Sequence, residues 1–202
     1  MRLAVLASGA GTNLQAILDT VHGRDGIELV AVASDRESAP ALERARAAGI
    51  PTGVFHHTDH PDRTARDGAM AAWLGEHGAE LVVLAGYMQL LSTAFLERFP
   101  SRVINVHPAL LPAFPGLDAI GQALDYGVKV FGVTVHFVDE GMDSGPVILQ
   151  RAVDLPDAAD RDEVHERLRP LEHELLPEAI RLIARGAVSP DPDNPRRVRI
   201  SR

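Results

Sequence analysis

The sequence predicts an α/β protein with a mostly parallel, twisted sheet and helices on both of its faces, in three layers. Short apolar segments alternate with segments of helical periodicity along most of the chain, which is the pattern of repeated βαβ units. Residues 81–85, Leu-Val-Val-Leu-Ala, are apolar without a break, as expected of a strand covered on both faces. The first apolar segment is followed directly by a glycine-rich turn and a helix, which is how a βαβ unit begins.

The first half of the chain contains four expected pairs of strand and helix. After the first strand, Leu14, Ile17, Leu18 and Val21 recur at the spacing of one helix face. Gly49 closes the second helix, as glycine often does. The expected strands are residues 3–7, 28–34, 52–55 and 81–85, and the expected helices are residues 14–21, 41–48, 62–77 and 93–99.

The second half begins with a strand over residues 102–107. Pro108 ends this strand, because proline has no N–H to donate to a neighbouring strand. The other expected elements are a helix at 119–126, an alternating strand within 128–139, a strand from 147, a helical region at 161–185 broken or kinked near Pro170 and Pro177, and an irregular, mobile tail over 188–202.

The composition is that of an ordinary globular protein and excludes several kinds of site. The chain has 202 residues, 46% hydrophobic and 24% charged, which is enough for one large domain or two small ones. A net charge of −8 and an aromatic content of 4% argue against nucleic-acid binding. The absence of cysteine excludes disulfides and thiolate nucleophiles. The N-terminal apolar run is too short for a signal peptide or a membrane span, so we expect a cytoplasmic protein without nucleic-acid or membrane partners.

Residues 8–13, Ser-Gly-Ala-Gly-Thr-Asn, form the expected turn between the first strand and the first helix. Such a turn points backbone N–H groups outward at a helix N-terminus, where the helix dipole favours an anion. Leu14 stands where a dinucleotide-binding fingerprint needs its third glycine, so a single phosphate monoester fits better than a dinucleotide. The alternative is an ordinary turn in which Thr12 or Asn13 caps the helix.

Asn105 and His107 are candidate catalytic residues at the end of the strand over residues 102–107. They are two residues apart, so both side chains leave the strand on the same face, and an amide donor and an imidazole point at one spot. Three prolines and a glycine within residues 108–116 restrict the following loop, which favours a rigid site wall. Ligands of open α/β sheets bind at the carboxyl ends of strands. The alternative is a structural or solvated histidine.

Three further loops contain candidate residues. Residues 86–91, Gly-Tyr-Met-Gln-Leu-Leu, either line a slot for a flat ligand or are tucked under the next helix. Residues 139–146 are acidic and rich in glycine, and a carboxylate from this turn either reaches His107 and favours its protonated form or is solvated. Residues 56–61 contain three histidines without the spacing of a known metal site, so we expect a solvated loop and no metal.

Four segments together closely resemble the phosphoribosylglycinamide formyltransferases, which are folate-dependent enzymes of purine synthesis. These segments are residues 8–15 (Ser-Gly-Ala-Gly-Thr-Asn-Leu-Gln), 84–88 (Leu-Ala-Gly-Tyr-Met), 105–112 (Asn-Val-His-Pro-Ala-Leu-Leu-Pro) and 143–148 (Asp-Ser-Gly-Pro-Val-Ile). The resemblance covers nearly the whole chain. A wider group of formyltransferases and deformylases shares the His-Pro-x-Leu-Leu-Pro segment, whereas the glycine loop and the length point to this family.

The resemblance implies a Rossmann-like formyltransferase fold in one domain over residues 1–187, followed by the tail over residues 188–202. A phosphate-binding half would occupy about residues 1–100, and a catalytic and folate-binding half about residues 101–187. The implied reaction transfers the formyl group of the co-substrate 10-formyltetrahydrofolate to the amine of glycinamide ribonucleotide, in purine (IMP) biosynthesis. The implied partners are these small molecules, with no metal, and a homodimer is left open.

Carried over residue by residue, the resemblance also implies the site residues. The catalytic residues would be Asn105, His107 and Asp143, and the ribonucleotide would be bound by Gly11, Thr12, Asn13 and Glu172. The folate would be bound by Arg63, Met88, Gln89, Leu90, Leu91, Asn105, Asp139, Glu140, Gly141, Met142 and Asp143. The chain departs from the family pattern where Gln89 replaces a common Arg, Ala113 a Lys and Phe114 a Tyr.

The implied chemistry fits these residue types. When the amine attacks the formyl carbon, the formyl oxygen becomes an oxyanion, to which the Asn105 amide and a protonated His107 can donate; such donors are worth about 3–4 kcal/mol each. Asp143 would keep His107 protonated and help to relay a proton through water to the leaving nitrogen.

Three alternatives are weighed against this hypothesis. A formyltetrahydrofolate deformylase uses the same three residues with water as nucleophile, but normally carries an N-terminal regulatory domain, for which a first strand at residue 3 leaves no room. A methionyl-tRNA formyltransferase needs a further C-terminal RNA-binding domain and a basic face, whereas this chain is acidic. A nucleotide-binding module without catalytic activity would not need Asn105, His107 and Asp143 together.

Overall fold

The computed structural model describes residues 1–201 of the chain. The strands of its main sheet follow the order β3-β2-β1-β4-β5-β6-β7. These strands are β1 (Arg2–Leu6), β2 (Glu28–Ser34), β3 (Thr52–Val54), β4 (Leu81–Leu84), β5 (Val103–His107), β6 (Val130–Phe137) and β7 (Val147–Asp154). The helices are α1 (Thr12–Thr20), α2 (Pro40–Ala47), α3 (Arg63–Glu76), α4 (Thr93–Arg98), α5 (Ala119–Tyr126), α6 (Arg161–Ala184) and the 3₁₀-helix η1 (His57–Asp59).

The predicted α/β fold with a mostly parallel sheet is confirmed. β1 pairs in parallel with β2 and β4, β2 with β3, and β4 with β5, whereas β6 and β7 are antiparallel. The expected elements before the tail are present, with ends that differ by a few residues. By its internal contacts the chain divides into two compact units, Met1–Asn105 and Val106–Arg202.

The first unit contains the parallel strands β1 to β4 with helices α1 to α4. From β1 the chain runs to β2 and β3 at one edge, and it returns through α3 to β4 on the other side of β1. Because βαβ crossovers are right-handed, this reversal places α1 and α2 on one face of the sheet and α3 and α4 on the other. All four residues of β4 are buried accordingly. The reversal also makes the gap between β1 and β4 the switch point where open α/β sheets bind ligands.

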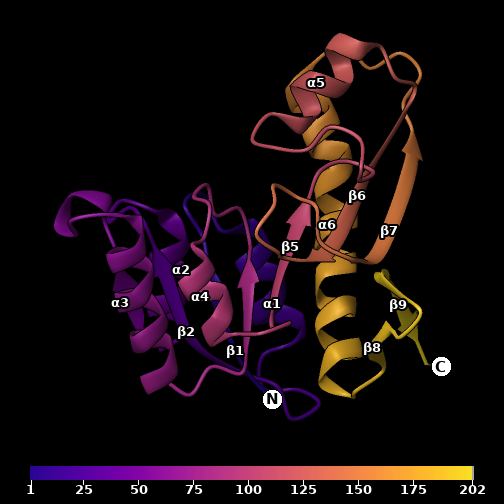
Figure 1. The fold of residues 1–202 in the computed structure, drawn as a ribbon. Helices are drawn as coiled ribbons and strands as arrows, with labels where there is room; N and C mark the ends of the chain where they lie inside the picture. The colour runs from indigo at the N-terminus through magenta and orange to yellow at the C-terminus, as the bar shows by residue number, and fades with distance from the viewer. Residues whose placement is uncertain (202) are drawn as a thin grey trace. The chain divides into compact units, whose positions relative to one another are not determined.

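The second unit contains the antiparallel pair β6 and β7, with α6 packed along it (Figure 1). The sequence predicts that α6 is broken or kinked near Pro170 and Pro177; the break is not found, because the helix continues through both prolines. An internal proline costs about 3 kcal/mol, whereas each leucine that α6 buries returns about 1.5–3 kcal/mol. The buried apolar residues of α6 outweigh the two prolines; they are Val164, Leu168, Leu175, Leu176, Ala179, Ile180, Leu182 and Ile183.

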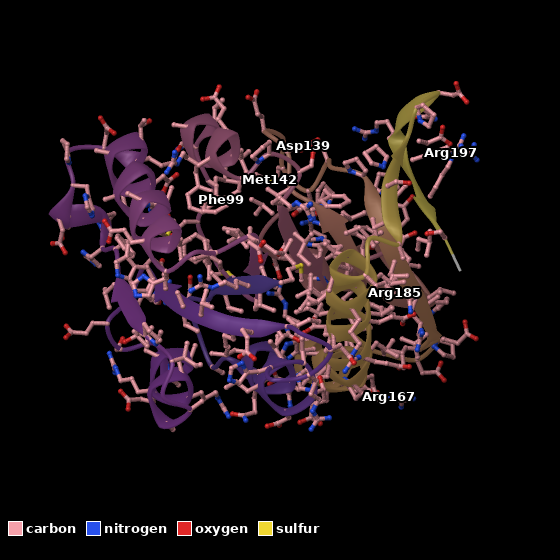
Figure 2. All side chains as sticks on the ribbon, turned by 90° about the horizontal axis from the view of Figure 1, so that it is seen from below. Phe99, Asp139, Met142, Arg167, Arg185 and Arg197 are labelled. Atoms are coloured by element: carbon pink, nitrogen blue, oxygen red, sulfur yellow. The ribbon has the colours of Figure 1, made fainter. Side chains whose placement is uncertain are left out.

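The segment after α6 differs from the irregular tail that we predicted. It forms an antiparallel hairpin of β8 (Val188–Asp191) and β9 (Asn194–Ile200), and β9 also contacts β7. The turn is stabilised by Asp191, whose side chain accepts hydrogen bonds from the Asp193 N–H and from Arg199, both at 3.0 Å. Pro190 lies in a strand that has one partner, where a missing N–H is tolerated. Figure 2 shows Arg197 on this hairpin, where its side chain is exposed.

Candidate active site

The glycine turn after β1 leaves the N-terminus of α1 without a side-chain cap. The N-cap residue is Gly11, in a left-handed conformation with a φ of 71°. A Cβ at Gly11 would lie 2.8 Å from the Cα and Cβ of Ala41 in α2, so only glycine fits here. Thr12 and Asn13 lie inside the helix, so the interpretation in which one of them caps it is wrong. Uncapped N–H groups at a helix N-terminus suit an anion.

The loops after β1 and β4 are joined at the switch point. The backbone N–H of Ser8 donates to the Gly86 carbonyl, and the N–H of Met88 donates to the Ser8 hydroxyl, both at 3.0 Å. The side-chain amide of Gln89 donates to a carboxylate oxygen of Asp35, which follows β2, at 3.1 Å. Loops from three neighbouring strands therefore hold one another at the carboxyl edge of the sheet.

The loop after β4 presents apolar side chains to solvent. Met88 is 45% exposed and Leu90 is 54% exposed, while Leu91 is half-buried. A loop tucked under the following helix would bury such side chains, so the exposure favours the predicted slot for a flat ligand. Arg63, also in the predicted folate set, is exposed in the first turn of α3. No described hydrogen bond or ion pair of residues 1–201 joins Arg63 to the other members of that set.

Asp143 is the centre of a polar cluster in the second unit. Its Oδ2 atom lies 3.4 Å from Nδ1 of His107 and accepts the backbone N–H of Gly116 at 2.8 Å. Its Oδ1 atom lies 3.6 Å from Nε2 of His136. Both histidines are buried, with 4% of His107 and 1% of His136 exposed. Asp143 is thus the carboxylate that the sequence analysis expected to reach His107.

The second nitrogen of His107 is engaged as well. Its Nε2 lies 2.8 Å from the carbonyl oxygen of Phe114, and because a carbonyl can only accept, Nε2 is the donor. Phe114 has a φ of 55°, which is uncommon for a residue other than glycine. Asn105 precedes His107 by two residues in β5, so the two side chains leave the strand on the same face.

The electrostatic surroundings of Asp143 favour its carboxylate form. Burial by itself would raise the pKa of Asp143. The contact with His136, the hydrogen bond from the Gly116 N–H and the charges of His107 and His136 outweigh burial, so the pKa lies below its ordinary value. At 3.6 Å the His136 contact is longer than a standard hydrogen bond, so we describe it as an ion pair. Asp143 is therefore ionised at neutral pH.

The turn after β6 supplies the rest of the predicted folate set (Figure 2). The Asp139 carboxylate accepts hydrogen bonds from the Gly141 N–H at 3.1 Å and from the Ser144 hydroxyl at 2.6 Å, so it stabilises the turn itself. Met142 is 52% exposed, and Glu140 and Gly141 are exposed too. The turn therefore offers one apolar side chain and open backbone at its surface.

Glu172 lies on α6 and is buried, with 6% of the residue exposed. Arg169 lies one helical turn before both Glu172 and His173, so it neighbours each of them on one side of the helix. The buried atoms Nε of Arg169 and Nε2 of His173 have no hydrogen-bond partner among residues 1–201. Burial lowers the pKa of His173, and the nearby charge of Arg169 lowers it further against the opposing effect of Glu172. This face can therefore take a polar ligand.

Sequence reasoning missed His136, Arg169 and His173. His136 stands inside an alternating strand, where a histidine is no signal by itself. The spacing of Arg169, Glu172 and His173 at i, i+3 and i+4 was the available signal on α6.

Within residues 1–201 no group of three or more His, Cys, Asp or Glu side chains could hold a metal ion. The loop with three histidines forms η1 instead, and Nδ1 of His56 contacts the Thr58 hydroxyl at 2.6 Å. No helix in the described part of the chain is long and apolar enough to cross a membrane.

Comparison with known proteins identifies the family. Residues 1–180 match the formyl transferase family. The chain is 45% identical to phosphoribosylglycinamide formyltransferase of Mycobacterium tuberculosis over 188 residues, which are 93% of this chain and 87% of that protein. It is 40% identical to the enzyme of the same name from Bacillus subtilis over 181 residues, covering 89% and 93% of the two chains.

A solved structure agrees with these sequence matches. Glycinamide ribonucleotide transformylase 1 of Symbiobacterium toebii superposes with a TM-score of 0.95 at 49% identity, over 100% of this chain and 94% of that one. The family expected from the four sequence segments is thereby confirmed. The chain belongs to the formyl transferase family, within the group of phosphoribosylglycinamide formyltransferases that its sequence resembles.

Proposed function

We propose that Asn105, His107 and Asp143 catalyse the formyl transfer of this family in the present chain. The enzyme moves the formyl group of 10-formyltetrahydrofolate to the amine of glycinamide ribonucleotide, giving formylglycinamide ribonucleotide and tetrahydrofolate in purine biosynthesis. The observation that carries the catalytic assignment is the contact of 3.4 Å between the buried His107 ring and Asp143, at the end of a strand.

In the proposed reaction the amine nitrogen forms a bond to the formyl carbon, and the bond from that carbon to the folate N10 breaks. A proton passes from the attacking nitrogen to N10. The Asn105 amide and the His107 ring donate to the intermediate oxyanion, for about 3–4 kcal/mol each. The ionised Asp143 contacts Nδ1 of His107 and orients the ring.

Nε2 is the nitrogen of His107 that turns away from Asp143, so it is the proposed donor to the oxyanion. In the present structure it donates to the Phe114 carbonyl at 2.8 Å. When substrate binds, the formyl oxygen therefore replaces the Phe114 carbonyl as the acceptor of this hydrogen bond. Until then, the carbonyl keeps the imidazole oriented. Phe114 belongs to the loop that follows His107 directly, so a local shift of that loop is enough to release Nε2 for the substrate.

The binding residues are proposals of the same kind. The N-terminus of α1, with Gly11, Thr12 and Asn13, binds the phosphate of the ribonucleotide through backbone N–H groups and the helix dipole. Glu172 binds the amine end. The folate is held by apolar and backbone contacts from the loop after β4 and the turn after β6, namely Met88, Gln89, Leu90, Leu91, Asp139, Glu140, Gly141 and Met142, with Arg63 near the cofactor.

The test is a spectrophotometric assay with purified protein and 10-formyl folate, with and without glycinamide ribonucleotide. Folate product that forms only with the ribonucleotide establishes the transferase. Equal product without it means a deformylase. Replacing His107 by Ala, and separately Asp143 by Asn, should lower the turnover rate by at least about a hundredfold, with the fold intact by circular dichroism. Turnover near that of the parent in both variants would refute the catalytic assignment.

Two further proposals concern the location of the protein in the cell and its oligomeric state. We propose that the enzyme works in the cytoplasm, a prediction that the cysteine-free sequence supports. The homodimer also stays a prediction, which sedimentation equilibrium over a range of protein concentrations would test.

A further inference from the structure

His136 is a buried polar residue that the proposed mechanism does not use. It lies near the end of β6, two residues after Thr134, and 1% of it is exposed. Burying a histidine lowers the stability of the fold unless both polar ring nitrogens have hydrogen-bond or charged partners. The partners of this ring therefore indicate what it does.

Both ring nitrogens of His136 face oxygen atoms. Nδ1 lies 2.8 Å from the carbonyl oxygen of Phe137, the next residue, and since a carbonyl only accepts, Nδ1 donates. This bond fixes the orientation of the ring against its own backbone. Nε2 is then aimed at Oδ1 of Asp143, 3.6 Å away. The ring is thus a rigid link between the backbone of β6 and one carboxylate oxygen.

The geometry around Asp143 shows why such a link is needed. The backbone of Asp143 is left-handed, with a φ of 49°, a conformation that aspartate tolerates better than most residues but that still needs support. Gly145 packs so closely on the Phe137 carbonyl that a Cβ there would overlap it, which docks the turn against the end of β6. The two carboxylate oxygens are shared, Oδ1 with His136 and Oδ2 with His107 and the Gly116 N–H.

The edge of the sheet is shaped at the same place. The pairing of β6 with β7 changes register between Val135 and His136, so that Ile148 of β7 is left without a partner. Such bulges re-aim side chains and occur often next to active sites. With regular pairing, β6 and β7 would stay in one register up to the end of β6. The bulge changes the register at His136, so that its side chain faces the turn that contains Asp143.

We propose that His136 is a positioning residue for formyl transfer: it holds Oδ1 of Asp143 so that Oδ2 stays directed at the imidazole of His107. His136 itself touches neither substrate nor the reacting atoms. This inference rests on the catalytic role proposed above for Asp143. It adds that the strand β6, through one histidine, sets the direction from which the carboxylate meets the catalytic ring.

The inference makes a prediction about the titration of Asp143 that a merely structural histidine would not make. The groups that face its carboxylate include His107 from β5, His136 from β6 and the Gly116 N–H; Asp139, in the same turn, is engaged with Gly141 and Ser144. Because the His136 contact lowers the pKa of Asp143, its loss should raise that pKa.

The experiment compares the parent enzyme with His136→Leu, which fills the space without a donor, and His136→Gln, whose amide can reach the position of Nε2. The Asp143 carboxyl carbon is followed by ¹³C NMR against pH, and its signal is assigned with Asp143→Asn. His136→Leu should titrate at higher pH than the parent, and His136→Gln should lie closer to the parent. His77→Leu, which removes a histidine at the end of α3, is the control and should not move the titration.

Kinetics supply the second readout. In His136→Leu, kcat should fall by up to about a hundredfold, the loss that a small misplacement of a catalytic group can produce, while KM for both substrates changes by less than about twofold. The acidic limb of the pH profile of kcat should move to higher pH, and His136→Gln should recover part of kcat. If His136→Leu does not fold, His136→Ala takes its place, with the same expected shift of the Asp143 titration and the same expected fall in kcat.

The outcomes separate this inference from the proposed function. An Asp143 titration that is the same in parent, His136→Leu and His136→Gln overturns the role of His136, whatever the activity. A fall in kcat that is uniform across pH, with no rescue by glutamine, also overturns it. Full turnover in Asp143→Asn would instead refute the catalytic role of Asp143, and the titration alone would then decide whether His136 holds the carboxylate.

Discussion

The carboxylate of Asp143 contacts two buried histidines and one backbone N–H. Burial raises the pKa of this carboxyl, but these contacts together lower it by more. The arrangement keeps a negative charge beside His107 at neutral pH. It also links Asp143 to stability, because a carboxyl with a depressed pKa contributes free energy of folding only while it is ionised.

The stability of the protein should therefore depend on Asp143 in acid. The folded-state pKa is lower than the unfolded value of about 3.9, so the contribution is present above that value and is lost as pH falls through the folded-state pKa. Asp143→Asn should lower the free energy of unfolding near pH 7, and the difference from the parent should shrink below about pH 4. Urea unfolding at several pH values measures this. Asp157→Asn, at an exposed position, is the control, and a difference that does not change with pH would contradict the prediction.

Gly11 provides a second prediction for a single residue. A methyl group there would meet Ala41 at 2.8 Å in a left-handed backbone, so Gly11→Ala must displace the turn that opens α1. The KM for the ribonucleotide should rise much more than the KM for the folate. Gly68→Ala, at an open position in α3, should change neither. Equal increases in both KM values would contradict the assignment of the phosphate to this turn.

Among the elements, the loop after β5 depends on strand β6 for its shape. The Thr134 hydroxyl accepts the N–H of Leu111 at 3.1 Å and donates to the Ala109 carbonyl at 2.6 Å. Gln150 of β7 donates to the Leu111 carbonyl at 2.8 Å and to the same hydroxyl at 2.9 Å. Thr134 and His136, two positions apart in β6, thus contact different loops, since Thr134 bonds to the loop after β5 and His136 faces Asp143 in the turn after β6.

Thr134→Val should consequently destabilise the protein although it preserves the side-chain shape. The change leaves the Leu111 N–H and the Ala109 carbonyl buried without partners, which should lower the free energy of unfolding by about 1–3 kcal/mol. Thr134→Ser keeps the hydroxyl and should cost less. Chemical denaturation of both variants decides the matter, and equal stabilities of the valine and serine variants would show that the hydroxyl is not what holds the loop.

For the whole molecule, the net charge has the same sign as the charge of the proposed substrate. The chain carries −8, yet the proposed ribonucleotide is an anion. Local geometry resolves this, because the uncapped N–H groups and dipole of α1 act over a few ångströms, within the screening length of salt. The overall charge acts against nucleic acid, whose binding needs many phosphate contacts at once.

Binding of the ribonucleotide alone should therefore stabilise the folded protein. At a concentration of about one hundred times Kd, mass action predicts a gain of about 2.7 kcal/mol, seen as a higher melting temperature in the absence of folate. In Gly11→Ala the same concentration should give a much smaller shift. An unchanged shift in that variant would place the binding of the phosphate elsewhere.

Much of the fold could be predicted because its signals are local. The continuous apolar run of β4 and the helical spacing of α1 are visible within a few residues, and the order of strands and helices then selects a parallel sheet. The hairpin of β8 and β9 was missed because its residues are prolines, arginines and polar groups whose pairing depends on each other and on β7. The continuity of α6 was missed because the proline rule is local, while the burial that overrides it is not.

The sequence by itself determined the fold class, the family and the residue types of the site, because periodicity and motif spacing are properties of neighbouring residues. It could not show that His136 faces Asp143, that Gly11 is pressed against Ala41 or that Thr134 holds the loop after His107. Each of these contacts joins residues from different elements, and only the packing of those elements in three dimensions brings them together.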